Sequence, residues 1–244
     1  MAKGTKSRRN LAVILLGLIA IAAAWQAYLA RSTTIEFEPI EDLPGWGQVV
    51  FPGVSVGGGG ATGAVLVGID AEDAPEPLTE SQLCRNLYPA ASRKLPVAVF
   101  SDANCPNCRS LEAKLAARSD RVHLTILHLP LLGPDSKSGA KAMVAAELQG
   151  LGTEFRSELL RQGSSPQLVG RIATASGVDA GQLTRDMDGP EVEARLLSAR
   201  RAAETLGVWG TPAMTIGKTL VMGDMPGRTL DRLIETFGAE EPGC

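Results

Sequence analysis

Cys105 and Cys108 are the residues of this 244-residue chain whose types and spacing most directly indicate chemistry. Two thiols three positions apart can close a small disulfide ring and reopen it by exchange with another thiol or disulfide. The pair stands in the segment FSDANCPNC, after a short apolar run of β-branched and aromatic residues and before a helical pattern. We therefore predict a redox-active disulfide where a buried strand ends and a helix begins.

The helix start gives the two cysteines different properties. With Cys105 at the N-cap, Pro106 takes the first helical position, where its missing N–H costs nothing, and Cys108 lies one turn later on the same side. The backbone N–H groups of Asn107 and Cys108 and the positive end of the helix dipole then lower the pKa of Cys105 from about 8.5 into a range of about 3.5 to 7.5. We expect Cys105 to form the mixed disulfide with a substrate and Cys108 to resolve it.

Half of a zinc site, a static structural disulfide, or chance could also produce a motif of this spacing. A tetrahedral zinc site needs two more ligands, and the chain has no second cysteine pair at this spacing and only two histidines. A rival from another class is a metal-handling protein in which the two cysteines hold Cu(I) with a thioether from Met214, Met222 or Met225. The predicted place of the pair at a helix N-terminus favours exchange chemistry over these alternatives.

The polar residues near the motif can be explained without a role in catalysis. Asp102 and Asn104 could accept or relay the proton of Cys108, but polarity at a helix N-terminus accounts for both. His123 and His128 lie in a predicted strand and face opposite sides of it. We expect neither histidine to be catalytic.

The elements expected around the motif begin with a strand, a helix and a second strand, which form a βαβ unit with a parallel strand pair. The apolar period then becomes helical over about seventy residues, and it returns to strands joined by a Gly-Lys turn. A closing amphipathic helix follows. These elements are the strands at residues 97–100 and 122–129, the helical region at about 135–206, the strands at 213–216 and 219–222, and the helix at about 230–237.

A second motif, Gly210-Thr211-Pro212, stands immediately before the first strand of that hairpin. With this order of elements, the chain over about residues 95–238 resembles the DsbA-like thiol–disulfide oxidoreductases of the thioredoxin superfamily. The resemblance implies an α/β thioredoxin fold with an inserted helical subdomain. It also implies that Pro212 is a cis-proline facing the cysteines and that Thr211 contacts the substrate backbone. Proline suits this place because it removes an N–H where a substrate strand must approach.

The direction of the reaction stays open at the level of sequence. The dipeptide between the cysteines is Pro106-Asn107, whereas strongly oxidising members have Pro-His, and Thr211 is more similar to the isomerase and reductase branches. The resemblance implies no cofactor beyond the redox-active disulfide. It also implies exported, cysteine-containing protein substrates and a membrane redox partner, either an oxidase or a reductase.

Composition narrows the class of protein. Hydrophobic residues make up 44% of the chain and charged residues 21%, which is typical of a folded globular protein. The 24 basic and 27 acidic side chains leave no basic surplus, so we expect no nucleic-acid partner. Four cysteines are too few for a disulfide scaffold of this length.

The other two cysteines, Cys84 and Cys244, stand far from the motif. Thr79 and Gln82 can form a capping box that starts a short helix near residues 80–88, with Cys84 turned inward as a small buried side chain. Because the cysteine count is even and export is expected, we also consider a structural disulfide between Cys84 and Cys244.

The N-terminal segment indicates export. Residues 11–30 carry no charge, and a helix of that length, at about 1.5 Å per residue, spans the roughly 30 Å hydrocarbon core of a bilayer. The basic tail at residues 1–10 keeps the N-terminus in the cytoplasm. We predict a single-pass anchor in a bacterial inner membrane, with the catalytic domain in the periplasm.

Two alternatives also export the domain: an A-x-A cleavage site at Ala22 and Ala24, or a twin-arginine signal at Arg8 and Arg9. Either would leave a soluble periplasmic protein. In this division of the chain, residues 31–94 are a loop-rich leader, residues 95–238 the thioredoxin domain and residues 239–244 a tail.

Overall fold

The computed structural model describes residues 14, 16–21, 23, 25–26, 36–50, 76–89, 92–238 and 244. Contacts divide the chain into two compact units, residues 1–37 with 50–56, and residues 38–49 with 57–244. The predicted anchor at residues 11–30 belongs to the first unit and lies largely outside the described residues, and the positions that are described within it are helical. Within the described ranges, no helix is both long enough and apolar enough to cross a membrane.

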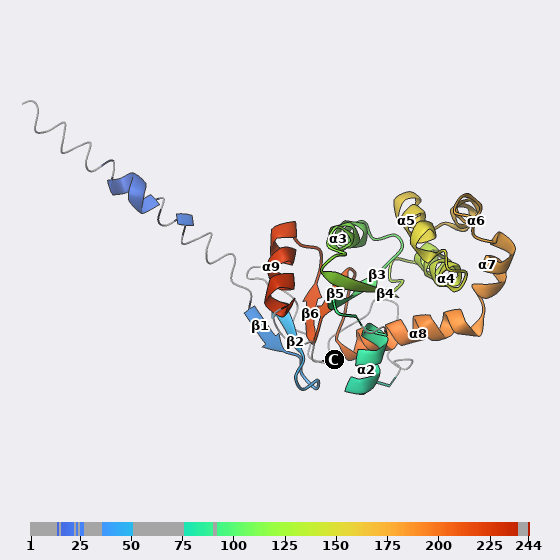
Figure 1. Cartoon of the computed structure of the whole chain (residues 1–244), viewed down its shortest axis with the longest axis horizontal. Coiled ribbons are helices and arrows are strands. Elements are labelled where there is room, and N and C mark those ends of the chain that lie inside the picture. Colours follow the sequence, from blue (N-terminus) through green and yellow to red (C-terminus); the bar gives the residue numbers. More distant parts are fainter. Residues whose placement is uncertain are drawn as a thin grey trace, which may run out of the picture. The chain divides into compact units, whose positions relative to one another are not determined.

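A mixed sheet of six strands, in the order β1-β2-β6-β5-β3-β4, forms the centre of the fold (Figure 1). β3 is parallel to β4 and antiparallel to β5, so both of its edges are paired. Residues 97–100 of β3 are fully buried, which explains their continuous apolar sequence. The strands are β1 Glu36–Pro39, β2 Gly47–Val50, β3 Leu95–Ser101, β4 Val122–His128, β5 Ala213–Ile216 and β6 Thr219–Met222.

Helices cover both faces of this sheet (Figure 1). Ala98 and Phe100 share a hydrophobic cluster with residues of α2 and α8, whereas Val97 and Val99 point to the opposite face by the alternation of the strand. On that opposite face, α9 contacts β3 and α3 contacts β4. The helices are α2 Glu80–Leu87, α3 Pro106–Ala116, α4 Pro134–Leu148, α5 Gly152–Gln162, α6 Pro166–Ala175, α7 Ala180–Asp186, α8 Pro190–Thr205 and α9 Gly227–Gly238.

The helices between β4 and β5 build a second hydrophobic cluster of their own. Phe155, Leu159 and Met143 are almost fully buried in it, together with Ile172 from α6. Ala103, from the loop after β3, belongs to the same cluster. The helical insertion is therefore packed directly against the segment that carries the two cysteines.

The leader predicted for residues 31–94 is corrected in part. β2 pairs in parallel with β6, with Gly47 opposite Thr219, and the preceding Trp46 is only 2% exposed. This pairing satisfies the backbone groups that β6 would otherwise leave unpaired at its outer edge. The helix predicted near residues 80–88 is α2, and the capping box of Thr79 and Gln82 is present. Residues 51–75 lie outside the described part of the chain.

Candidate active site

The two cysteines of the motif lie where β3 leads into α3. Cys105 is the N-cap residue of α3, Pro106 is the first residue of the helix, and Cys108 follows one turn later. A disulfide joins the two, with their Cα atoms 5.2 Å apart. The backbone N–H of Cys108 donates a hydrogen bond to Sγ of Cys105 at 3.1 Å. The first turn of the helix therefore directs a backbone donor at Cys105, where it would stabilise negative charge.

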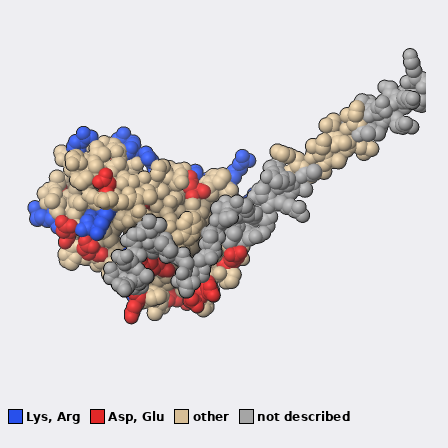
Figure 2. Space-filling view, turned by 180° about the vertical axis from the view of Figure 1, so that it is seen from behind, with Lys and Arg blue, Asp and Glu red and all other residues tan. Residues whose placement is uncertain are grey.

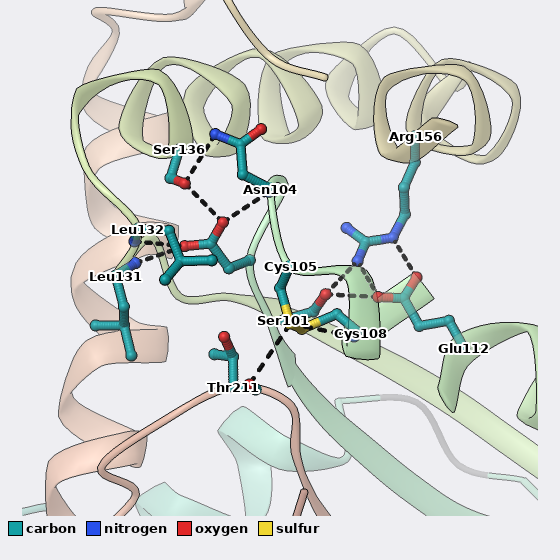
Figure 3. The surroundings of a disulfide bond; sticks show 11 residues. Ser101, Asn104, Cys105, Cys108, Glu112, Leu131, Leu132, Ser136, Arg156 and Thr211 are labelled. Carbon is teal, nitrogen blue, oxygen red and sulfur yellow. Dashed lines mark hydrogen bonds and ion pairs between the residues drawn. A yellow bond between two sulfur atoms is a disulfide. The ribbon is translucent and has the colours of Figure 1, made fainter. Parts of the chain in front are cut away.

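The cis-proline segment approaches the same sulfur. Phe100 of β3 is paired with Ala213 of β5, so the residues just before Ala213 lie beside the end of β3. The Thr211–Pro212 peptide bond is cis. The carbonyl oxygen of Thr211 lies 3.5 Å from Sγ of Cys105 (Figure 3). The antiparallel register thus brings together two motifs that are 106 residues apart in the sequence.

Burial distinguishes the two sulfur-bearing residues only slightly. Cys105 is 5% exposed, and Cys108 is completely buried. Pro106 and Asn107, between them, are exposed. An approaching thiol therefore meets Cys105 before Cys108.

Asp102 ties the loop before Cys105 to the connection between β4 and α4. Its buried carboxylate accepts hydrogen bonds from the backbone N–H groups of Asn104 at 2.7 Å, Leu131 at 2.6 Å and Leu132 at 2.9 Å. The hydroxyl of Ser136 donates a fourth at 2.7 Å (Figure 3). These four donors give the carboxylate a structural role, which is to join two connections of the fold rather than to supply polarity at the start of α3.

Asn104 makes a second connection to the helical insertion. Its amide nitrogen donates to the hydroxyl of Ser136 at 3.1 Å, and its amide oxygen accepts from the hydroxyl of Ser164 at 2.8 Å. Ser136 lies in the first turn of α4, and Ser164 lies between α5 and α6. The loop that holds Cys105 is thus bound to two separate places in the insertion.

A buried charged pair, which no sequence pattern predicted, lies beneath the disulfide. Glu112 lies on α3, four residues after Cys108, and Arg156 reaches it from α5. Two hydrogen bonds join their side chains, at 2.9 Å and 2.5 Å, and Ser101 at the end of β3 contacts both (Figure 3). The four-residue spacing could have indicated Glu112, but no local pattern indicates that Arg156 is its partner.

His128 continues this network away from the disulfide. Burial lowers its pKa, and the positive charge of Arg156 lowers the pKa further, against the opposing effect of its hydrogen bond with Glu147. Nη1 of Arg156 lies 3.1 Å from Nδ1 of His128, and a guanidinium can only donate, so Nδ1 is the acceptor. Nε2–H then donates to Glu147 at 2.8 Å. His128 is therefore a neutral link in the network and does not contact the disulfide in any hydrogen bond of the described residues.

Residues 96–235 match the DSBA-like thioredoxin domain. The chain belongs to this family. A thioredoxin-like oxidoreductase from Silicibacter pomeroyi DSS-3 is 30% identical, with 67% of this chain and 100% of that chain covered and a TM-score of 0.60. No curated protein matches the sequence.

Two more distant structures share the fold. The thiol-disulfide exchange protein α-DsbA2 from Wolbachia pipientis is 19% identical, with 64% of this chain and 92% of that chain covered and a TM-score of 0.57. A periplasmic thioredoxin-like protein from Salmonella enterica serovar Typhimurium is 21% identical, with 67% and 99% covered and a TM-score of 0.56. The predicted DsbA-like thioredoxin fold and the predicted oxidoreductase class are confirmed.

DsbA-like proteins use a redox-active disulfide in place of an external cofactor. Among the described residues of this DsbA-like chain, no group of three or more His, Cys, Asp or Glu side chains could hold a metal ion. The three methionines considered for Cu(I) lie in or against the core: Met214 is fully buried, Met225 is 4% exposed, and Met222 packs against the cluster around Phe100. Their packing accounts for all three.

The remaining cysteines of this DsbA-like chain also form a disulfide. Cys84 on α2 is joined to Cys244, with their Cα atoms 5.4 Å apart. Cys84 is half-buried and packs against the cluster that α2 shares with α8. The bond connects α2 with residue 244 across 160 positions of the sequence.

Proposed function

We propose that this DsbA-like protein catalyses thiol–disulfide exchange in exported proteins through the Cys105–Cys108 pair. The observation that carries the proposal is the meeting of three features at one sulfur. Sγ of Cys105 lies in a disulfide, accepts a backbone N–H from the first turn of α3, and faces the carbonyl of Thr211 across 3.5 Å. A static structural disulfide needs neither the helix N-terminus nor the cis-proline segment.

The exchange proceeds in two balanced steps. In oxidation, a substrate thiolate attacks Sγ of Cys105, the bond to Cys108 breaks, and the electron pair leaves on Cys108, which takes up a proton. A second substrate thiolate then attacks the substrate sulfur of the mixed disulfide and releases Cys105 as a thiolate. In reduction the Cys105 thiolate attacks a substrate disulfide and forms a mixed disulfide. Cys108 then attacks Sγ of Cys105 and releases the reduced substrate. Isomerisation uses the mixed disulfide without net transfer of electrons.

Substrate docking is assigned to Thr211 and Pro212, with an apolar rim beside them. Thr211 is half-buried, and Pro212 has no N–H to obstruct an extended peptide. Trp209 is 50% exposed two residues before Thr211, and Leu132 is 53% exposed next to the backbone that binds Asp102. Exposed large apolar side chains in the segments next to Thr211 and Asp102 suit the binding of an unfolded, cysteine-containing segment.

We place the catalytic unit in the periplasm and residues 11–30 in the inner membrane, as a signal-anchor. The uncharged sequence and the basic residues before it support this placement. Where residues 11–30 are described, large apolar side chains such as Leu16, Ile21 and Trp25 are exposed. On the face shown in Figure 2, basic side chains form small separate groups, which gives no support to a nucleic-acid partner. Cleavage to a soluble periplasmic form is the alternative, and sequencing the N-terminus of the cell-derived protein distinguishes the two.

The direction of exchange follows from the redox potential of the couple and the pKa of the Cys105 thiol. If the protein is an oxidant that a membrane oxidase regenerates, we expect a redox potential of about −120 mV and a Cys105 thiol pKa of about 3.5. If the protein is a reductase that receives electrons from a membrane partner, we expect a redox potential of about −270 mV and a Cys105 thiol pKa of about 7. Titration against glutathione or dithiothreitol and thiolate absorbance measure both quantities.

Trapping tests the assigned roles of the cysteines. Cys108→Ser should accumulate mixed disulfides with exported proteins, because the resolving thiol is absent. Cys105→Ser should accumulate none, because the attacking sulfur is absent. The double variant Cys84→Ser/Cys244→Ser is the matched control and should exchange disulfides as the wild type does. Equal adducts from both single variants would contradict the assignment, and stoichiometric Cu(I) binding without adducts from Cys108→Ser would favour the metal-handling alternative.

A further inference from the structure

A buried ion pair lies one helical turn below Cys108. Nε and Nη2 of Arg156 donate to the two carboxylate oxygens of Glu112, at 2.9 Å and 2.5 Å. The two side chains are only 10% and 12% exposed. Ser101 donates to the same carboxylate at 2.5 Å and accepts from Arg156 at 2.9 Å. The pair therefore has two parallel hydrogen bonds and a shared third partner.

The remaining donors of the guanidinium are also occupied. Nη1 of Arg156 contacts Nδ1 of His128 and Sδ of Met143, both at 3.1 Å. These two contacts come from β4 and α4, and those of Ser101 and Glu112 come from β3 and α3, so four elements besides α5 hold the guanidinium in one orientation. Taking such a pair out of water is costly, and packing alone would be served equally well by apolar side chains. The burial of the pair thus calls for a reason beyond stability.

The pair lies close to the place where charge changes during the reaction. Cys108 and Glu112 are four residues apart on α3, so their side chains are neighbours on one helix face, with Cβ atoms about 5–6 Å apart. Figure 3 shows Arg156 reaching from α5 to Glu112 and Ser101, with Glu112 on the same helix as Cys108. Because both cysteines are buried, charges here are screened less than at the surface.

We propose that the Glu112–Arg156 pair sets the equilibrium between the disulfide and dithiol forms of Cys105–Cys108. Arg156 neutralises Glu112, so the thiolate that reduction creates on Cys105 meets no net negative charge from α3. Arg156 belongs to the helical insertion, which thereby controls the redox equilibrium without touching the sulfurs. The inference rests on the proposed role of Cys105–Cys108 as the redox couple.

The reaction that measures this effect is reduction by glutathione. Two glutathione molecules break the Cys105–Cys108 bond and become glutathione disulfide. Cys105 is left as a thiolate and Cys108 as a thiol, and the second proton passes to solvent. A positive charge near the site favours this product, and a negative charge disfavours it.

The two single substitutions should therefore act in opposite directions. Glu112→Gln leaves the charge of Arg156 unbalanced and should raise the equilibrium constant for reduction by about tenfold, equivalent to about 30 mV. Arg156→Gln leaves the charge of Glu112 unbalanced and should lower the constant by a similar factor. The double variant Glu112→Gln/Arg156→Gln should return to within about threefold of the wild type.

Opposite changes in the equilibrium constant for reduction distinguish control of the redox equilibrium from a purely structural role of the Glu112–Arg156 pair. Each single variant leaves one buried charge without its partner, so both should lose folding stability in the same direction. Arg156→Lys keeps the positive charge but loses the two parallel hydrogen bonds to Glu112. This variant should therefore be less stable, with a nearly unchanged equilibrium constant for reduction. Lys141→Gln, which removes a cation bridged to Asp188 and Glu193 elsewhere in the insertion, is the control for losing any positive charge.

The proposal is overturned if Glu112→Gln and Arg156→Gln shift the constant in the same direction, or if neither shifts it by more than about twofold. If Arg156→Gln does not fold, Glu112→Gln and Arg156→Lys decide: the first must raise the constant and the second must preserve it. A wild-type protein whose Cys105–Cys108 bond does not equilibrate with glutathione would instead refute the proposed function itself.

Discussion

The two sulfurs of the Cys105–Cys108 disulfide have different neighbours, although both residues are almost completely buried. Sγ of Cys105 accepts a backbone N–H and faces the carbonyl of Thr211. Cys108 has Glu112 in the next turn of its helix, tied to Arg156. At the scale of single residues, the site therefore separates an outer sulfur, directed at substrate, from an inner sulfur next to a neutralised charge pair.

His128 predicts a pH dependence of folding. Burial lowers its pKa in the folded protein, whereas the unfolded chain has an ordinary value near about 6.5. The contribution of neutral His128 to the free energy of unfolding is fully present above that value. It is lost as pH falls below it, because the unfolded chain then binds a proton that folded His128 does not. Between pH 7.5 and pH 5.5 we expect a loss on the order of 1 kcal/mol.

Urea unfolding at several pH values checks this expectation. His128→Gln should flatten the pH dependence between pH 7.5 and pH 5.5, because glutamine does not titrate. His123→Gln, on the same strand, is the matched control for replacing a histidine that does not bond to Arg156 or Glu147 in the described residues. An unchanged slope in His128→Gln would show that another group is responsible.

At the scale of elements, the helical insertion and the active-site loop fit together at Gly139 of α4. A Cβ added there would lie 2.5 Å from Cβ of Ser164 and 2.8 Å from Cβ of Ala103. The absence of a side chain at Gly139 thus allows α4, the loop before Cys105 and the α5–α6 connection to approach one another. The hydrogen bonds of Asn104 with Ser136 and Ser164 lie in the same place.

Gly139→Ala should therefore destabilise the protein, by about 1–3 kcal/mol, because the added methyl group overpacks this junction. Gly170→Ala in α6 is the matched control: nothing lies within 4 Å of its added Cβ, so higher helix propensity should stabilise by up to about 1 kcal/mol. Chemical denaturation of both variants measures the difference. Two effects of the same sign would contradict the packing argument.

At the scale of the molecule, β2 and α2, which precede β3 in the sequence, are integral parts of the folded unit. β2 extends the sheet beyond β6, and α2 packs against α8. The hydroxyl of Tyr88, after α2, donates to the carbonyl of Gly217 in the β5–β6 turn at 2.7 Å. The Cys84–Cys244 disulfide then links α2 to the C-terminal residue across 160 positions.

Loss of this disulfide should reduce the free energy of unfolding strongly. A disulfide that closes a loop of this length lowers the conformational entropy of the unfolded chain. In the chain-entropy treatment this stabilises the folded state by as much as about 5 kcal/mol. We expect Cys84→Ser/Cys244→Ser to unfold at a clearly lower denaturant concentration than the wild type, with the exchange reaction retained. A loss below about 1 kcal/mol, or non-reducing peptide maps with both thiols free, would rule out the stabilising bond.

The parts of this protein that sequence alone determined are local. The N-cap at Cys105, the helix start at Pro106, the capping box at Thr79 and the hairpin at Gly217 depend on residues within a few positions, and all are present. The thioredoxin fold and the oxidoreductase class followed because the CPNC and GTP motifs stand in a recognisable order of strands and helices.

Only the tertiary structure decided which distant groups meet. Arg156 pairs with Glu112 across 44 positions, Ser164 with Asn104 across 60, and β2 with the edge of β6. Many arginines, serines and short strands in the sequence could fill such places. Which of them does so depends on the packing of the whole insertion and on which sheet edge remains unpaired, and these are properties of the assembled fold that no short stretch of sequence contains.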